Sequence, residues 1–125
     1  MASTEDSESE GREVHGTISF GEDVQPFDRA TAYVRLEDVS VADAPARVVA
    51  QSVISNLAKP RAGEGIPFTL PAGRINPRAS YNVRVLVDVD GDGQTTAGDY
   101  VSVQSYPVLT FGYPPEVSIT VRRVR

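Results

Sequence analysis

The sequence YNVRVLVDVDGDGQTTAGDYVSV, residues 81–103, places an aspartate- and glycine-rich segment between two runs of β-branched and aromatic residues. Such runs favour extended strands, whereas aspartate and glycine favour turns. The flanking residues also alternate between apolar and polar side chains, which is typical of strands with one buried face. We therefore expect a strand at 81–87, a loop at 88–99 and a strand at 100–105.

The expected loop has the spacing of a calcium-binding loop. Carboxylates stand at its first, third, fifth and twelfth positions, and Gly93 stands at the sixth, where a sharp turn is needed. Alternate residues of a curling chain can point their oxygen atoms at one centre, which suits a hard divalent cation. The predicted Ca²⁺ ligands are Asp88, Asp90, Asp92, the carbonyl oxygen of Gln94, Thr96 and Asp99.

Two features of the loop predict weak binding. The twelfth position is Asp99 rather than the longer glutamate, and the flanking segments favour strands rather than the helices of calcium sensors. We therefore expect an affinity on the order of 10⁻⁴ to 10⁻³ M, with magnesium binding less well. The alternative is a hairpin turn that binds no metal, because aspartate and glycine also suit turns for backbone reasons.

Composition limits the chain to one domain. It has 125 residues, no cysteine and a formal net charge of −5, and 7% of its residues are aromatic. Without cysteine it has no thiol chemistry, disulfide bonds or lipid-modified cysteine. Its only basic cluster is the terminal Arg122, Arg123 and Arg125, so we expect no binding of nucleic acid.

The first residues are polar and acidic. Residues 1–13 hold five acidic residues and one arginine, a net charge of −4. This composition predicts a disordered acidic tail at 1–13, followed by a folded domain at 14–125. No apolar run approaches the roughly 20 residues that span a bilayer, and no export signal is visible. We expect a monomer in the periplasm or cell envelope if a targeting segment was removed, and in the cytoplasm otherwise.

Short alternating segments separated by turn residues predict an all-β fold. With no segment of sustained helical period, we expect an antiparallel β-sandwich of about seven strands in a single domain. The expected strands are 14–20, 30–39, 47–54, 66–70, 81–87, 100–105 and 116–124.

The patterns also predict where individual segments lie. In 30–39 the alternation places Leu36 inward and Glu37 outward. Residues 47–54 carry apolar side chains on both faces, so we expect this strand to be well covered. Pro67 cannot donate to a strand ladder, so 66–70 is expected at a sheet edge.

The sequence gives little support for catalysis. There is one histidine, His15, on the polar face of the first expected strand, and there is no Gly-x-Ser-x-Gly motif. Glu37 and Asp38 are adjacent carboxylates, but neighbours in a strand point to opposite faces. We therefore expect a protein that is not an enzyme, and a hydrolase that uses the acidic loop remains an alternative.

Several sequence segments together resemble a known family, and they occur in the same order along the chain. They are Val34–Ser40, Ala42–Ala50, Ile66–Leu70, Arg74–Tyr81 and Ser105–Thr110. From about Val14 to Val124 the chain resembles the YbaY/YscW family of small putative lipoproteins. The resemblance implies a small β-sandwich that is often tethered to the cell envelope. The best understood branch of the family consists of pilot proteins, which escort an outer-membrane secretin ring in type III secretion. It implies no catalytic residues.

Together these observations predict a non-enzymatic, envelope-type β-sandwich that acts as a binding or assembly module and is stabilised by one Ca²⁺ in the Asp88–Asp99 loop. A protein partner in the cell envelope is expected. The main alternative is a pilot or chaperone for an outer-membrane secretion component, with no dependence on metal.

Overall fold

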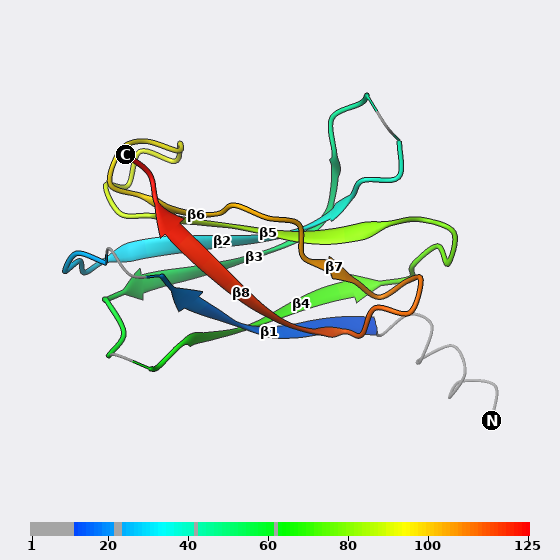
Figure 1. The fold of residues 1–125 in the computed structure, drawn as a ribbon, viewed down its shortest axis with the longest axis horizontal. Coiled ribbons are helices and arrows are strands. Elements are labelled where there is room, and N and C mark those ends of the chain that lie inside the picture. Colours follow the sequence, from blue (N-terminus) through cyan, green and yellow to red (C-terminus); the bar gives the residue numbers. More distant parts are fainter. Residues whose placement is uncertain (1–11, 22–23, 42, 62) are drawn as a thin grey trace.

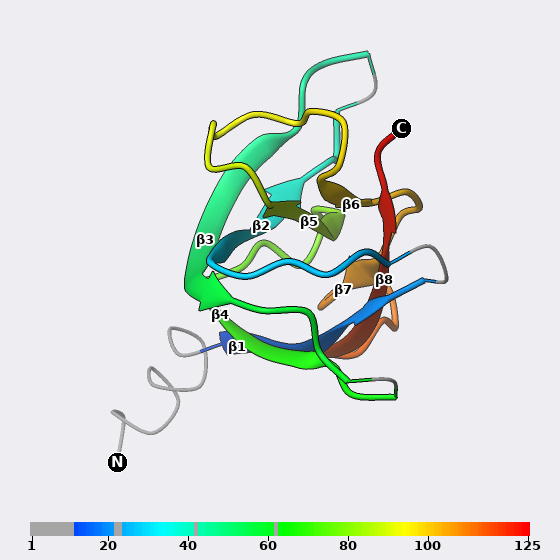
Figure 2. The same cartoon turned by 90° about the vertical axis from the view of Figure 1, so that its left-hand side faces the viewer.

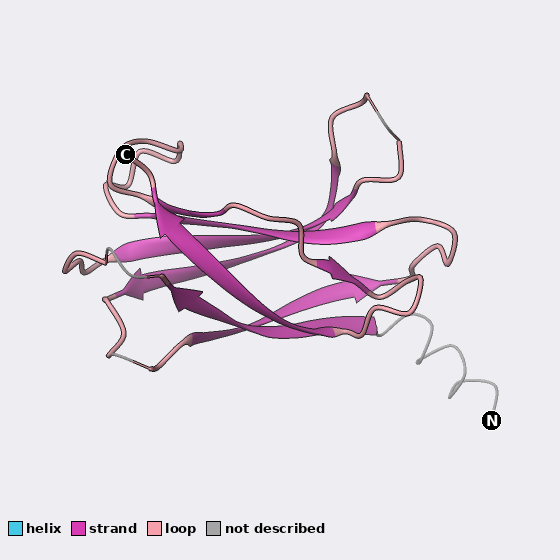
Figure 3. Ribbon diagram, viewed as in Figure 1, coloured by secondary structure: helices cyan, strands magenta, loops and turns pink. Residues whose placement is uncertain are grey.

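The computed structural model describes residues 12–21, 24–41, 43–61 and 63–125, and in these ranges the regular elements are all strands (Figure 3). Most of the expected acidic tail, residues 1–11, lies outside the described residues. The strands are β1 (Arg12–Phe20), β2 (Ala30–Asp38), β3 (Arg47–Leu57), β4 (Ile66–Gly73), β5 (Tyr81–Asp88), β6 (Tyr100–Ser102), β7 (Pro107–Val108) and β8 (Glu116–Arg123).

The all-β prediction is confirmed, but the expected two-sheet antiparallel sandwich is not. The strands form a single sheet in the order β3-β2-β5-β6-β8-β1-β4, with β7 paired to β5. The pairing of β1 with β8 is parallel, whereas the other pairs are antiparallel. The sheet curls until β3 and β4, its two ends, come into contact, so it is nearly a closed barrel (Figures 1 and 2).

The core fills the inside of this curled sheet. Alternate residues of the long strands β1, β2, β4, β5 and β8 point inward and are buried, whereas the inward residues of β3 are only partly buried. Leu36 is fully buried, as the alternation predicts. Glu37, which follows Leu36 and was predicted to point outward, is nevertheless buried, and its Oε1 accepts a hydrogen bond at 3.1 Å from Nε of Arg84, whose side chain is exposed. The largest fully buried side chains are Tyr100, Ile18, Leu36, Leu70, Ile119, Val14, Val34, Val83, Val85, Val87, Val108 and Val121.

The two strands at the ends of the sheet behave differently from each other. The predicted edge position of the strand containing Pro67 is confirmed, because β4 is the last strand of the order. The expectation that 47–54 is well covered is wrong. β3 is the other end of the sheet, and Val48, Val49 and Val53 are exposed, because no element covers its outer face in the part of the chain that the structure describes.

The turn from β2 to β3 is tied to the body of the protein at its base. Asp38 Oδ1 accepts hydrogen bonds from the backbone N–H and the hydroxyl of Ser40, and Ser40 Oγ accepts one from Ser80 N–H at 2.8 Å. The hydroxyl of Ser40 lowers the pKa of Asp38 below its ordinary value, helped by the Ser40 N–H and by Arg47. Beyond this base the turn projects from the sheet (Figures 1 and 2).

Replacing Asp38 with asparagine should therefore destabilise the protein in a pH-dependent way. Because its pKa is depressed in the folded state, the ionised carboxylate stabilises the fold above its ordinary pKa of 3.8, and this stabilisation is lost as the pH falls through the lower folded value. We expect a cost of about 1 kcal/mol at neutral pH. Denaturant unfolding from pH 7 to 3 should show that the difference in free energy of unfolding between the wild-type chain and Asp38→Asn shrinks as the pH falls. The exposed Asp43→Asn serves as the control and should differ from the wild-type chain by the same amount across this range.

In the described ranges, no helix is long and apolar enough to cross a membrane.

Candidate functional site: the Asp88–Asp99 loop

The acidic loop connects β5 to β6 at one end of the sheet (Figure 1). Asp88 is the last residue of β5, and Tyr100 begins β6, so the two strands hold the ends of the loop together. Gly93 has a φ of 75°, a left-handed conformation that L side chains rarely adopt. The predicted sharp turn at position six is therefore present.

The structure brings the four predicted carboxylates together. One oxygen atom from each of Asp88, Asp90, Asp92 and Asp99 lies within 4.8 Å of the others. Such a spacing matches several oxygen ligands around one cation, whose distances to Ca²⁺ are about 2.3–2.6 Å. The side chains that the spacing predicted to converge do converge in space.

Two of the carboxylates are buried and organise the backbone of the loop. Asp88 accepts hydrogen bonds from Gly91 N–H at 3.0 Å and Gly93 N–H at 2.8 Å. The side chain of Asp99 accepts from Val89 N–H at 2.8 Å and from Thr96 N–H at 2.9 Å. Asp88 and Asp99 are only 1% and 0% exposed, so the loop keeps its shape through its own acidic residues.

The remaining predicted ligands, Thr96 and Gln94, are hydrogen-bonded to carboxylates of the cluster. Thr96 Oγ1 donates to Asp90 Oδ2 at 2.8 Å and lies 3.1 Å from Asp99 Oδ2. Gln94 is positioned by its N–H, which donates to Asp92 Oδ1 at 2.9 Å. The role of its carbonyl oxygen as a ligand stays a prediction.

The electrostatics of the cluster are those of crowded carboxylates. Burial raises the pKa of Asp88 above its usual value, and the Asp90 and Asp99 carboxyls raise it further, against the N–H groups of the loop. The hydroxyl of Thr96 is the main reason that the pKa of Asp90 lies below its usual value. Bringing several carboxylates together disfavours their ionised forms, and a divalent cation among them would favour ionisation instead.

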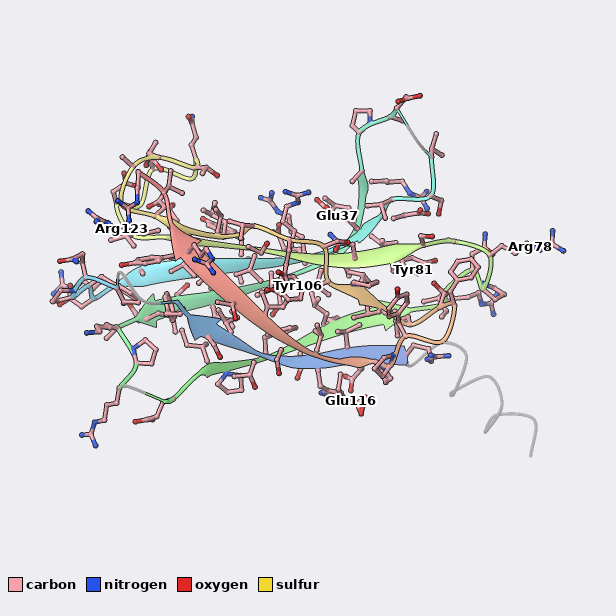
Figure 4. All side chains as sticks on the ribbon, viewed as in Figure 1. Glu37, Arg78, Tyr81, Tyr106, Glu116 and Arg123 are labelled. Atoms are coloured by element: carbon pink, nitrogen blue, oxygen red, sulfur yellow. The ribbon has the colours of Figure 1, made fainter. Side chains whose placement is uncertain are left out.

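The loop is also hydrogen-bonded to Val124, the residue that follows the last strand. Gly98 N–H donates to the carbonyl of Val124 at 2.9 Å, and Val124 N–H donates to the carbonyl of Asp99 at 2.7 Å. Arg123, at the end of β8, lies at this end of the molecule, and Arg78 lies at the opposite end (Figure 4). The acidic loop therefore fixes the C-terminal segment as well as the β5–β6 connection.

The single histidine, His15, is exposed on the surface of β1. His15 Nε2 is 3.3 Å from Glu13 Oε1, and its Nδ1 is 3.4 Å from Thr69 Oγ1. An acid, a histidine and a hydroxyl are thus adjacent, but all three side chains are exposed on the outer face of β1 and β4. The distance to Thr69 is also longer than a strong hydrogen bond, so this group matches the surface position expected for His15.

A second surface feature was not found by sequence reasoning. The β7–β8 connection exposes Phe111 and Tyr113, which are 67% and 51% exposed, at the end of the molecule opposite the acidic loop. Phe111 has a φ of 55°, which is uncommon for an aromatic residue. The hydroxyl of Thr110 anchors the connection by donating to the buried carbonyl of Ala79 at 2.7 Å. The sequence signal was a Phe-Gly-Tyr-Pro-Pro turn between two strands.

The fold and the loop define a small all-β protein with a nearly closed sheet and a carboxylate cluster at one end. The chain belongs to the YscW family of type III secretion system lipoprotein chaperones, whose family model matches residues 9–121. The family resemblance read from the sequence is therefore confirmed.

A solved structure is similar over nearly its whole length. It is an alternative pilotin from the type II secretion system of Vibrio cholerae, with 25% sequence identity and a TM-score of 0.70. The match covers 90% of this chain and 96% of the pilotin chain. Among curated proteins, none matches this chain.

Proposed function

We propose that this protein is a non-enzymatic, pilotin-like chaperone that binds a secretin of a bacterial secretion system in the cell envelope. The observation that carries the proposal is the match to a pilotin over 90% of this chain and 96% of the other. A family of secretion chaperones matches residues 9–121 as well. This function corresponds to the main alternative drawn from the sequence rather than to the calcium-stabilised assembly module.

The β7–β8 connection is the surface we propose for the secretin. Exposed aromatic side chains on a braced backbone lose little conformational entropy on binding and often dominate the energy of protein interfaces. Phe111 and Tyr113 meet this description, because Thr110 holds the connection to Ala79 and Tyr113 N–H donates to the carbonyl of Thr110 at 3.1 Å. Left-handed backbone at Phe111 is a cost that a function at this position would explain.

This function predicts a loss of secretin assembly in cells. The protein and the secretin encoded in the same genome would be co-expressed, and the fraction of secretin recovered as outer-membrane multimers measured. Replacing both Phe111 and Tyr113 with serine should reduce that fraction at least about tenfold, because each truncated hot-spot side chain costs about 2 kcal/mol or more.

The matched control is Val103→Ser, which changes a side chain that is 59% exposed and lies outside the β7–β8 connection. It should leave the secretin multimers unchanged. If multimers form equally well without the protein, the chaperone function is wrong. If they need the protein but tolerate the double serine variant, the proposed surface is wrong.

We also propose that the Asp88–Asp99 loop binds one Ca²⁺ as a structural ion. The convergence of four carboxylates within 4.8 Å and the raised pKa of Asp88 support a site that gains from a divalent cation. Asp88, Asp90, Asp92, Thr96 and Asp99 would hold the ion with the Gln94 carbonyl. The ion would stabilise the fold and the bonded C-terminal segment, and it would take no part in a chemical reaction.

A further inference from the structure

Two arginines lie side by side on the outer face of the curled sheet. Arg35 of β2 and Arg84 of β5 stand directly opposite each other in the antiparallel ladder, and opposite residues share a face. Like charges in this arrangement destabilise a sheet. Arg84 pairs with Glu37 at 3.1 Å, whereas Arg35 makes no ion pair with any described residue. One carboxylate therefore offsets two guanidinium groups.

Both guanidinium groups are held by contacts that leave their tips available. Arg35 Nε donates to Oε1 of Gln51, an uncharged amide, at 2.8 Å, and its guanidinium carbon lies 5.9 Å from the centre of the Tyr33 ring. Arg84 Nε donates to Glu37 Oε1. Since each of these hydrogen bonds uses Nε, the terminal NH₂ groups can donate to a ligand. Side chains positioned in this way lose little conformational entropy when they bind an anion.

The two arginines line a small pocket beside the acidic loop. Its volume is about 90 Å³, and it is also lined by Tyr33, Val85, Leu86, Thr95, Val101 and Ser102. A water molecule takes up about 30 Å³ in the liquid, so the pocket has room for about three non-hydrogen atoms, the size of a carboxyl group. Ser102 Oγ accepts a hydrogen bond from Val85 N–H at 3.0 Å, and its own hydrogen can therefore be donated to an anion.

An apolar row adjoins the arginine pair on the same face. Tyr33 stands opposite Val53 of β3 and Leu86 of β5, and Leu86 stands opposite Val101 of β6. All four side chains are at least partly exposed. Because Tyr33 and Arg35 are two residues apart in one strand, the apolar row and the arginine pair are about 7 Å apart. Neighbouring residues of one protein segment can reach both.

We infer that this pocket binds the carboxylate of an aspartate or glutamate side chain of a partner protein, whose apolar neighbours pack on the row from Val53 to Val101. Arginine suits this anion, because its planar fork can donate two parallel hydrogen bonds to one carboxylate. A phosphate dianion fits less well. Thr95 belongs to the Asp88–Asp99 loop, whose four carboxylates repel a doubly charged anion more strongly than a singly charged one.

The inference goes beyond the proposed chaperone function. The pocket is built from β2, β5, β6 and the acidic loop, whereas the surface proposed for the secretin is the β7–β8 connection. Failure of one surface would therefore leave the other intact. Metal-stripped protein is used in the test, so that the result is also independent of the proposed calcium site.

Two peptides that differ in one charge test the inference. The blocked tripeptides valyl-glutamyl-valine and valyl-glutaminyl-valine would be titrated into isotope-labelled protein, and the Nε–H signals of Arg35 and Arg84 followed by NMR. The glutamate peptide should shift both signals until they saturate. The glutamine peptide should bind at least about tenfold more weakly, because it lacks the charge-assisted hydrogen bonds. No saturable shift with the glutamate peptide, or equal binding of the two peptides, would overturn the inference.

Matched variants separate recognition at the pocket from attraction by net charge. Arg35→Gln should weaken binding of the glutamate peptide at least about tenfold and leave the circular dichroism spectrum unchanged, because Arg35 contacts only surface groups. Arg78→Gln removes the same charge from an exposed arginine at the opposite end of the molecule and should bind like the wild-type chain (Figure 4). Equal losses in the two variants would overturn the site.

Two further arms test the kind of anion. Arg35→Lys keeps the charge but loses the planar fork, so it should also bind the glutamate peptide more weakly than the wild-type chain. Inorganic phosphate should shift the Arg35 and Arg84 signals less strongly than the glutamate peptide at equal concentration. Tighter binding of phosphate would overturn the assignment to a carboxylate.

Discussion

Calcium at about 10 mM, roughly 100 times a dissociation constant of about 10⁻⁴ M, should raise the melting temperature of the metal-stripped protein by about 10 °C. A ligand at 100 times its dissociation constant adds about 2.7 kcal/mol to the free energy of unfolding. In a domain of 125 residues each kilocalorie corresponds to roughly 4 °C. The rise should be specific for calcium, because magnesium needs tight octahedral geometry and retains its water, whereas this loop offers many flexible oxygen atoms.

Asp90→Asn is the variant that isolates the ion. Asp90 is exposed and accepts a hydrogen bond from Thr96, whereas Asp88 and Asp99 are buried and hold the backbone of the loop. The variant should fold normally and lose most of the calcium-dependent shift. Asp43→Asn, which removes an exposed carboxylate from the β2–β3 turn, should keep the full shift. Equal melting temperatures with and without calcium in the wild-type chain would leave the loop as a hairpin turn.

Gly16→Ala should destabilise the fold by about 2–3 kcal/mol, toward the upper end of the range for overpacked substitutions. Gly16 lies in β1 opposite Phe68 of β4 and Val117 of β8. A Cβ atom at this position would overlap the ring of Phe68 and the backbone carbonyl oxygen of Val117. The ring can move, but the carbonyl belongs to the parallel ladder that joins the two halves of the sheet.

The matched control is Gly21→Ala. A Cβ atom there would meet its nearest neighbour, the carbonyl oxygen of Val121, at 3.5 Å, which is ordinary contact. This variant should be nearly neutral in chemical denaturation, whereas Gly16→Ala should shift the midpoint strongly. Similar midpoints for the two variants would show that the close packing of β1 between β4 and β8 is wrong.

The sequence predicted the positions of the strands better than their arrangement. Alternation shows which residues of a strand face the core, and the inward position of Leu36 follows from it. It does not show which strand lies next to which. The parallel pairing of β1 with β8 joins residues about 100 positions apart, and that pairing makes one curled sheet out of what the pattern predicted as a sandwich.

The misplaced and missed features each have a specific structural cause. β7 contains only two residues, Pro107 and Val108, too few for a period to be recognised. The apolar residues on both faces of β3 predicted a covered strand, but the same pattern occurs when an apolar face is left exposed. Glu37 is buried because Arg84 pairs with it across neighbouring strands, a contact that depends on register.

The candidate loop was the most predictable part of the site. Its ligand spacing is local in the sequence, so the convergence of Asp88, Asp90, Asp92 and Asp99 could be predicted without knowing the fold. The bonds that tie the loop to Val124 could not, because they depend on β8 lying beside β6. Phe111 and Tyr113 were missed because exposure of an aromatic residue is decided by the surrounding fold.

Direct binding of the purified protein to the purified secretin encoded in the same genome tests the proposed function most directly. Biolayer interferometry in detergent and calcium should show saturable binding with a dissociation constant in the micromolar range or tighter. The Phe111→Ser, Tyr113→Ser double variant should lose this binding, and Val103→Ser should retain it. The absence of saturable binding by a folded wild-type chain would contradict the assignment of this protein as a pilotin-like chaperone.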